Sequence, residues 1–269
     1  MPKSGSESFR AFYNKTLCYN ELMKKSILVV ANWKLQPKNL KEAEKIISGY
    51  SLPRGLSVVV CPPSVYIYPL RKANKGRIMF GAQNVFYEKE GAFTGEISVG
   101  MIEDVGASYA LVGHAERRAL GETDEEVAKK VGLVARSGLK VVLCVGERER
   151  DEHGFYLNNL KSQLERGLKE ITPALLKNVV VAYEPLWAIG ASVAITPRDL
   201  QETTLYLKKV LHSLYKEKGF SVPILYGGSV SSDNASSFVD SGEVDGLLVG
   251  RESLKPKSFN AILENIANA

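Results

Sequence analysis

The fold is decided by a pattern that is clearest in the stretch VVVAYEPLWAIG, residues 179–190. Its apolar beginning, residues 179–182, predicts a buried strand, because short continuous apolar runs bounded by turn residues are typical of one. Glu184 follows this run and is itself followed by a stiff Pro-Leu-Trp segment. We therefore expect a carboxylate held at the end of a strand, where it can serve as a base at the mouth of a pocket.

Other chemically active side chains also follow apolar runs. The segments concerned are Asn32-Trp33-Lys34, Gly113-His114-Ala115-Glu116-Arg117-Arg118 and Tyr226-Gly227-Gly228-Ser229. If the strands before them are parallel neighbours, a cation, an imidazole, a carboxylate and a glycine-rich cradle for an anion meet on one face. Each group alone has an ordinary structural explanation, so the prediction depends on their combination.

Apolar runs and amphipathic segments alternate along most of the chain. Candidate strands are residues 27–31, 56–61, 78–82, 109–112, 140–145, 178–183, 223–226 and 246–249. They are nearly continuous runs of Val, Ile and Leu, which is typical of parallel strands covered on both faces. The length of 269 residues alone allows two small domains or one large barrel. Eight strands alternating with helices over about 245 residues favour a single (β/α)8 barrel of α/β class, whose active site lies at the C-terminal ends of the strands.

Two intervening segments carry clear helix signals. Thr123 and Glu126 form a capping box, and Gly138 is placed to end that helix. Thr196 and Pro197 begin another helix. Leucines at 200, 207, 211 and 214 then form an apolar stripe, and we expect this second helix to end at Gly219.

Composition narrows the class of protein. The chain is 45% hydrophobic, and its net charge of +5 is too diffuse to indicate nucleic acid binding. No apolar run approaches the length of a membrane span. Cys18, Cys61 and Cys144 are odd in number and form no CxxC pair, which predicts free thiols in a reducing compartment and hence a cytoplasmic protein.

The first residues differ from the rest of the chain. Residues 1–22 are polar and lack the apolar core of a secretory signal. We expect them to be a flexible extension, with residues 23–269 forming the catalytic barrel domain. Met23 is then a candidate natural start, a hypothesis that mass spectrometry of the native protein would test.

The polar segments, taken together and in order, resemble the triosephosphate isomerase family from about Lys24 to Ala269. The segments that carry the resemblance are Ala31-Asn32-Trp33-Lys34, Gly81-Ala82-Gln83-Asn84, Gly91-Ala92-Phe93-Thr94-Gly95-Glu96, Val112 to Arg118, Cys144-Val145-Gly146-Glu147, Tyr183 to Gly190, Tyr226 to Val230 and Val249-Gly250. Any one of these segments alone would be weak evidence. Their order and even distribution make the resemblance specific.

The resemblance implies catalytic roles for three residues. Glu184 is similar to the family's general base and Lys34 to its cation. His114 is similar to the neutral histidine electrophile, for which this family is itself the established example. A helix N-terminus at His114 would disfavour the imidazolium form.

The resemblance also implies the residues that surround the reaction. Substrate would be bound by Asn32, Gly190, Ser192, Gly228, Ser229, Gly250 and Arg251. Residues 185–196 would form a lid that excludes water. Glu116 would lie near Lys34, and Tyr226 would hold the closed lid. Thr94 and Glu96 would lie at a homodimer interface.

Several positions depart from the family pattern, among them Ser192, where the lid loses a glycine. Ala191 replaces a residue with a hydroxyl in the lid, and Ala115 replaces a serine that touches the resting glutamate. Arg251 stands where a second glycine is usual and adds charge at the phosphate site. We expect altered lid kinetics and an altered Michaelis constant rather than lost chemistry.

The implied function is the interconversion of dihydroxyacetone phosphate and D-glyceraldehyde 3-phosphate, a step of glycolysis and gluconeogenesis. The sequence carries no metal cluster, dinucleotide fingerprint or Walker loop, so no metal or cofactor is expected. Two alternatives stay open at this point. One is a barrel that only binds a phosphorylated ligand or a protein partner, and the other is an isomerase of a different small sugar phosphate.

Overall fold

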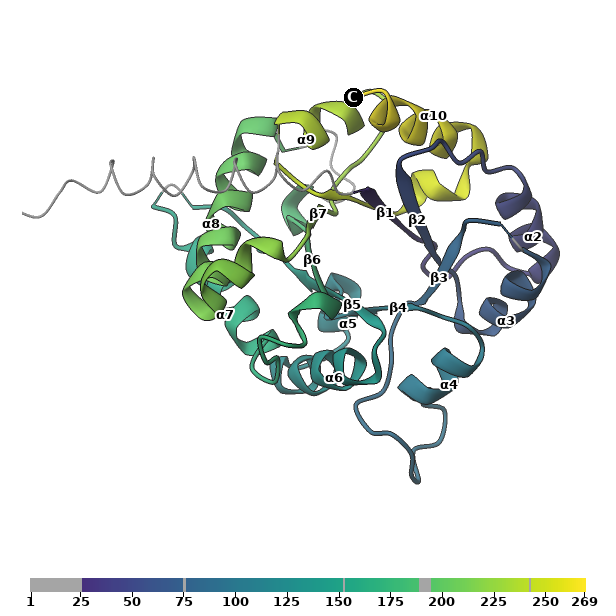
Figure 1. The fold of residues 1–269 in the computed structure, drawn as a ribbon, viewed down its shortest axis with the longest axis horizontal. Helices are drawn as coiled ribbons and strands as arrows, with labels where there is room; N and C mark the ends of the chain where they lie inside the picture. The colour runs from purple at the N-terminus through teal and green to yellow at the C-terminus, as the bar shows by residue number, and fades with distance from the viewer. Residues whose placement is uncertain (1–25, 75, 152, 189–194, 242) are drawn as a thin grey trace, which may run out of the picture.

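The protein folds into a closed barrel of eight strands surrounded by helices (Figure 1). The computed structural model describes residues 26–74, 76–151, 153–188, 195–241 and 243–269. Each strand pairs in parallel with its neighbours in chain order, and β8 pairs with β1 to close the ring. The single (β/α)8 barrel predicted from the alternation of apolar runs and helices is confirmed. The predicted extension, residues 1–22, lies outside the described residues.

The strands are short and almost fully buried. They are β1 (Ile27–Asn32), β2 (Leu56–Cys61), β3 (Met79–Ala82), β4 (Tyr109–Val112), β5 (Lys140–Val145), β6 (Val179–Tyr183), β7 (Ile224–Tyr226) and β8 (Gly246–Val249). Four of the eight match the predicted ranges at both ends, and the others differ by one residue at one end. Apolar continuity located the strands well because both faces of a barrel strand are covered.

Most helices surround the barrel wall, whereas the short α5 is drawn inside this ring, beside β4 and β5 (Figure 1). The helices are α2 (Leu40–Ser48), α3 (Ser64–Ala73), α4 (Val99–Asp104), α5 (Ala115–Ala119), α6 (Asp124–Ser137), α7 (Tyr156–Gly167), α8 (Pro197–Tyr215), α9 (Ala235–Ser241) and α10 (Pro256–Ala267). Short 3-10 helices are η1 (Leu176–Asn178), η2 (Leu186–Ala188), η3 (Lys216–Ser221) and η4 (Arg251–Leu254).

Alternate residues of each strand point into two separate cores. The barrel interior is filled by a small cluster that includes Val30, Val142 and Leu225. The larger core lies between the barrel and the helices and takes the intervening strand residues, for example Val29 and Val181. The period of two in side-chain direction produces this division.

The capping signals of α6 are confirmed. The Thr123 side chain accepts the backbone N–H of Glu126, and the Glu126 carboxylate accepts the N–H of Thr123. Gly138 follows the helix at φ 95°, in the left-handed region that favours glycine. Val127, Val131 and Val134 are fully buried, so α6 packs an apolar face into the core.

The end predicted for α8, the helix expected to begin at Thr196 and Pro197, is wrong. α8 begins at Pro197 as expected but ends at Tyr215, because Lys216 adopts φ 55° and a 3-10 turn follows. Gly219 lies within that turn, where a β-carbon would come within 2.3 Å of the Leu211 carbonyl oxygen. The glycine therefore permits close packing of the turn on α8 and does not cap the helix. Leu214, the last residue of the predicted stripe, is 40% exposed.

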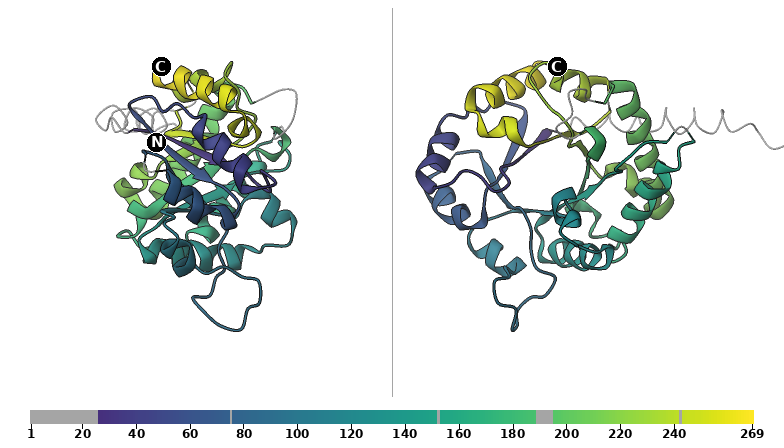
Figure 2. Two further views of the ribbon diagram at one scale, coloured as in Figure 1. Left: turned by 90° about the vertical axis from the view of Figure 1, so that its right-hand side faces the viewer. Right: turned by 180° about the vertical axis from the view of Figure 1, so that it is seen from behind.

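One loop stands away from the barrel. It connects β3 to α4 and projects beyond the helices in both views of Figure 2. Its base is closed by a hydrogen bond from the Phe86 N–H to the Ile97 carbonyl, and the rings of Phe86 and Phe93 lie 4.7 Å apart. Thr94 and Glu96, the residues expected at a dimer interface, are exposed on this loop.

Two further sequence expectations concern the chain as a whole. Cys61 and Cys144 are buried free thiols in the barrel interior, while Cys18 lies outside the described residues. Within the described part of the chain, no helix combines the length and the apolarity needed to cross a membrane.

Closure of the barrel predicts that one glycine of β8 cannot be replaced without loss of stability. In β8, Gly246 pairs with Leu28 of β1, and an added β-carbon would meet the Leu28 carbonyl oxygen at 1.9 Å. We expect Gly246→Ala to lower the free energy of unfolding by about 3 kcal/mol, measured by urea denaturation. Gly100→Ala is the control, since its nearest neighbour is 3.9 Å away. Equal stability of the two variants would contradict the prediction.

Candidate active site

A cavity opens at the C-terminal ends of the strands. Its volume is 620 Å³, and polar groups from several strand ends share it. The lining includes Asn32, Lys34, His114, Glu184, Gly227, Gly228, Ser229, Gly250 and Arg251. The structure thus brings together the side chains that the sequence analysis predicted to meet.

Glu184 is placed at the rim of the barrel by its backbone. Its N–H donates to the Val145 carbonyl at 2.8 Å, and only 3% of the residue is exposed. Two glycines make room for it. A β-carbon on Gly146 would lie 1.8 Å from the Glu184 carbonyl oxygen, and one on Gly227 would lie 2.8 Å from its Cγ. Both glycines are therefore required by close approach rather than by turn geometry.

His114 lies between β4 and α5 and caps that short helix. Its Nδ1 accepts the backbone N–H of Glu116 at 3.2 Å, so the single proton of a neutral imidazole resides on Nε2. Nε2 is 3.2 Å from Oε1 of Glu184. The Nε2–H group therefore faces the carboxylate and the cavity.

The pKa of His114 reflects opposing effects. Burial is the largest and lowers the pKa, while the neighbouring Glu184 carboxylate raises it. Lys34 lowers it further and Glu116 raises it, and the net direction in the ligand-free site is upward. Glu184 is the group that reverses the effect of burial.

Lys34 is held in a costly backbone conformation. Its φ of 55° lies in the left-handed region, which is unfavourable for a residue with a side chain. The Asn32 side chain accepts the Lys34 N–H at 3.0 Å, and Gln83 donates to the Lys34 carbonyl at 2.8 Å. The ammonium lies 2.6 Å from Glu116, as expected from the sequence. Asn32 and Gln83 thus fix the cation at the cavity.

The glycine-rich segment after β7 forms one wall of the cavity. Gly228 packs against the Tyr226 ring, since an added β-carbon would lie 2.1 Å from the Tyr226 hydroxyl oxygen. The Ser229 hydroxyl donates to the Ala188 carbonyl at 2.7 Å and so joins this wall to the segment after Glu184. Gly250 and the exposed Arg251 border the same cavity. Gly190, Ala191 and Ser192 lie outside the described residues.

Tyr226 is buried beneath this wall. Burial raises the pKa of its hydroxyl well above the usual range, while the backbone at Ile195 and Ser229 lowers it in part. The hydroxyl therefore stays protonated and faces the end of the expected lid segment.

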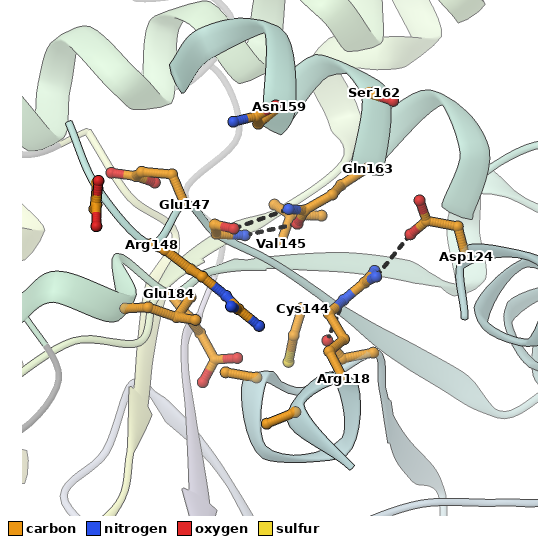
Figure 3. A pocket seen from close by; sticks show the side chains of 16 residues that line it. Arg118, Asp124, Cys144, Val145, Glu147, Arg148, Asn159, Ser162, Gln163 and Glu184 are labelled. Carbon is orange, nitrogen blue, oxygen red and sulfur yellow. Dashed lines mark hydrogen bonds and ion pairs between the residues drawn. The ribbon is translucent and has the colours of Figure 1, made fainter. Parts of the chain in front are cut away.

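A second pocket lies behind Glu184 (Figure 3). Its volume is 900 Å³, and it is bordered by the loops after β4 and β5 and by α7. Ala115, Cys144 and Glu184 line it together with Arg118. Burial, and next the Glu184 carboxylate, raise the pKa of the Cys144 thiol well above its usual range. Glu184 lines both pockets, so it forms part of the wall between them.

Sequence reasoning did not assign some residues that the structure brings to the site. Gln83 was quoted only within a segment that carries the family resemblance, although its amide donates to the carbonyls of both Lys34 and Cys61. Glu147 was noted without a role, yet its buried carboxylate contacts the segment that follows Glu184. The available signal was position in the sequence, because Gln83 comes directly after a predicted strand and Glu147 comes two residues after one.

Fold and site together define a (β/α)8-barrel enzyme with a carboxylate–imidazole pair at the C-terminal ends of its strands. The model of the family described as "Triosephosphate isomerase" matches residues 27–266. The chain therefore belongs to the triosephosphate isomerase family.

Individual relatives agree with this assignment. The chain is 40% identical over 246 residues to triosephosphate isomerase of Saccharomyces cerevisiae, covering 89% of this chain and 98% of that protein. It is 39% identical to the Aquifex aeolicus protein of the same name, over 88% of this chain and 98% of the relative. It is 37% identical to triosephosphate isomerase of Natranaerobius thermophilus, over 88% of this chain and 94% of that protein.

The balance of charges at His114 gives a test. Glu184→Gln removes the carboxylate that raises the pKa of His114, leaving burial as the dominant effect. We expect the pKa to fall below its ordinary value of 6.5, measured by NMR titration of the imidazole. Glu116→Gln is the matched control and should cause a smaller decrease, because Glu116 is exposed and 3.8 Å from Nδ1. An unchanged pKa in Glu184→Gln would contradict the assignment.

Proposed function

We propose that this enzyme interconverts dihydroxyacetone phosphate and D-glyceraldehyde 3-phosphate in glycolysis and gluconeogenesis. The observation that carries the proposal is the buried pair of Glu184 and His114, 3.2 Å apart in a cavity that also holds Lys34. Family membership supports the same reaction.

Glu184 is proposed to act as the general base. Its carboxylate takes a proton from the carbon beside the carbonyl group and returns it to the neighbouring carbon. Removing such a proton needs a base held close to carbon and shielded from water. The burial of Glu184 and the fixed backbone at Gly146 and Gly227 support this role.

His114 is proposed to act on the oxygens. Its Nε2–H polarises the carbonyl group and supplies the proton that is moved between the two oxygens of the enediolate. A substrate lying between His114 and Glu184 separates them and removes the main effect that raises the histidine pKa. Burial and the helix N-terminus at α5 then both favour neutral imidazole.

Lys34 is proposed to stabilise negative charge on the enediolate oxygen and on the phosphate. Asn32 orients it through the contact with its N–H. The backbone N–H groups of Gly228, Ser229, Gly250 and Arg251 are proposed to bind the phosphate, because glycine-rich backbone admits an anion closely. The Arg251 side chain adds a cation at the same end of the cavity.

Residues 185–196 are proposed to form the lid, with Gly190 and Ser192 contributing to phosphate binding and Tyr226 holding the closed state. The Ala188–Ser229 hydrogen bond supports a coupling between the lid and the phosphate wall. A barrel that only binds ligands is not favoured, because such a protein has no need of a base and an electrophile placed this close together.

The enzyme is proposed to be a homodimer. Of the eight large exposed apolar side chains among the described residues, six lie between β1 and β5, and they are Leu35, Val65, Tyr68, Phe93, Met101 and Leu120. Large exposed apolar side chains gathered in this way indicate an interaction surface. Thr94 and Glu96 lie on the projecting loop beside Phe93 and are proposed to contact the partner.

The cytoplasm is proposed as the compartment. Cys61 and Cys144 are buried without a disulfide, which suits a reducing environment. No contact with nucleic acid or membrane is proposed.

The proposed base gives the central test. Glu184→Gln keeps the size of the side chain but removes its basicity. We expect kcat with D-glyceraldehyde 3-phosphate to fall by ~10³-fold or more, measured in a coupled assay at equal protein concentration. Glu264→Gln, an exposed carboxylate on α10, should leave kcat unchanged. Absence of turnover by folded wild type would overturn the proposed function, and a panel of small sugar phosphates would reveal a different substrate.

The proposed dimer gives a separate test. Thr94→Arg places a bulky charge on the exposed surface of the projecting loop, where it would oppose close packing of two subunits. We expect the sedimentation coefficient to fall to that of a monomer at micromolar concentration. Thr172→Arg makes the same change at an exposed threonine between α7 and η1 and should leave the dimer intact. A wild-type protein that sediments as a monomer would refute the proposal.

A further inference from the structure

Arg150 lies close to the active site but outside its cavity. It belongs to the loop that follows β5, three residues after Glu147, and its side chain is only 20% exposed. Its guanidinium is surrounded by groups from four different parts of the chain.

The polar contacts of Arg150 are directional. Its Nε donates to Oε1 of Glu147 at 3.1 Å. Its Nη2 donates to the Tyr183 hydroxyl at 2.9 Å and to the Thr203 hydroxyl at 2.8 Å. The contacts therefore connect the loop after β5 to the end of β6 and to α8, which begins directly after the expected lid.

The planar face of the guanidinium is also in contact. Its Cζ lies 4.8 Å from the centre of the Tyr156 ring and 5.2 Å from that of Trp187. Such cation–π contacts favour one orientation of the aromatic ring. Trp187 is the third residue after Glu184, so this contact acts on the first turn of the lid.

Glu147 joins Arg150 to that same turn. Its Oε1 accepts hydrogen bonds from Arg150, from the Tyr183 hydroxyl at 2.8 Å and from the Trp187 indole at 2.8 Å. Its backbone carbonyl accepts the Leu186 N–H at 2.9 Å. Residues on both sides of Glu184 are therefore bound to Glu147.

Arg150 supplies the positive charge that balances the buried Glu147 carboxylate. The Glu147 side chain is fully buried, and a buried carboxylate without a cation is strongly unfavourable. Among the described residues, Arg150 is the cation in ion-pair contact with it. Burial and the nearby carboxylate raise the pKa of Tyr183, which keeps its hydroxyl protonated as a donor to Glu147.

We propose that Arg150 is a positioning residue that fixes the first turn of the lid, and through it Glu184, by holding Glu147 and Trp187. The inference rests on the proposed isomerase function for its kinetic consequence. Arg150 touches neither substrate nor reacting atoms. Its effect is on the geometry of proton abstraction, which is sensitive to displacements of about 1 Å.

The test combines kinetics with a direct report on Trp187. Arg150→Met keeps much of the apolar stem but removes the charge and the donors. We expect kcat to fall by ~10- to 100-fold, with a smaller change in KM. The chain has two tryptophans, Trp33 and Trp187, so fluorotryptophan labelling gives two 19F NMR resonances that Trp187→Phe assigns. The Trp187 resonance should shift in Arg150→Met and the Trp33 resonance should not.

Matched variants separate positioning from a loss of stability. Arg54→Met removes an exposed arginine from the segment between α2 and β2 and should change neither kcat nor the Trp187 resonance. Arg150→Lys keeps the charge but cannot donate to Glu147, Tyr183 and Thr203 together, so it should restore kcat only in part. Thr203→Val removes one partner of Arg150 and should give a smaller shift of the same resonance, which keeps the test available if Arg150→Met does not fold.

The outcomes are distinct. An unmoved Trp187 resonance with unchanged kcat in folded Arg150→Met would overturn the inference. Equal shifts of both tryptophan resonances would also overturn it, since they would indicate a general loss of structure. Wild type without isomerase activity would refute the proposed function instead, and the Trp187 resonance would still report whether Arg150 positions the lid.

Discussion

Closure of the parallel strand ring is the constraint on which the rest of this structure depends. Because all eight strands run in one direction, the residues that follow them come together at one end of the barrel. Asn32, His114 and Glu184 are separated by many residues in the chain, yet each follows or ends a strand of this ring. The cavity is therefore a product of the topology, and its chemistry is a product of which side chain stands at each strand end.

The site needs close backbone approach as much as it needs reactive side chains. Gly146 and Gly227 leave the space that the Glu184 backbone and side chain occupy. Lys34 accepts an unfavourable φ, which Asn32 and Gln83 hold in place. Beyond these contacts, the buried Glu147–Arg150 pair links β6 to α8. The charges of Glu147 and Arg150 are thus paired with each other beside the reacting centre.

The sequence predicted the barrel well because its signals are local. Apolar continuity located the strands, and Thr123 with Gly138 marked both ends of α6. The end of α8 was predicted wrongly because a glycine in the sequence can either cap a helix or pack closely against one. Gly219 packs against α8. Leu214 likewise matched the helical stripe but lies beyond the region that the barrel covers. Helix spacing alone does not show where the covering surface stops.

By itself, the sequence determined the order of strands and helices and the residue types at each strand end, because these follow from patterns a few residues long. Resemblance of those segments to one family supplied the candidate roles of Glu184, His114 and Lys34. Only the tertiary structure decided the 3.2 Å contact of His114 with Glu184, the bridging position of Gln83 and the enclosure of Glu147 by Arg150. The physical reason is that pKa shifts, burial and ion pairing depend on groups distant in the chain, whose distances are set when the barrel closes.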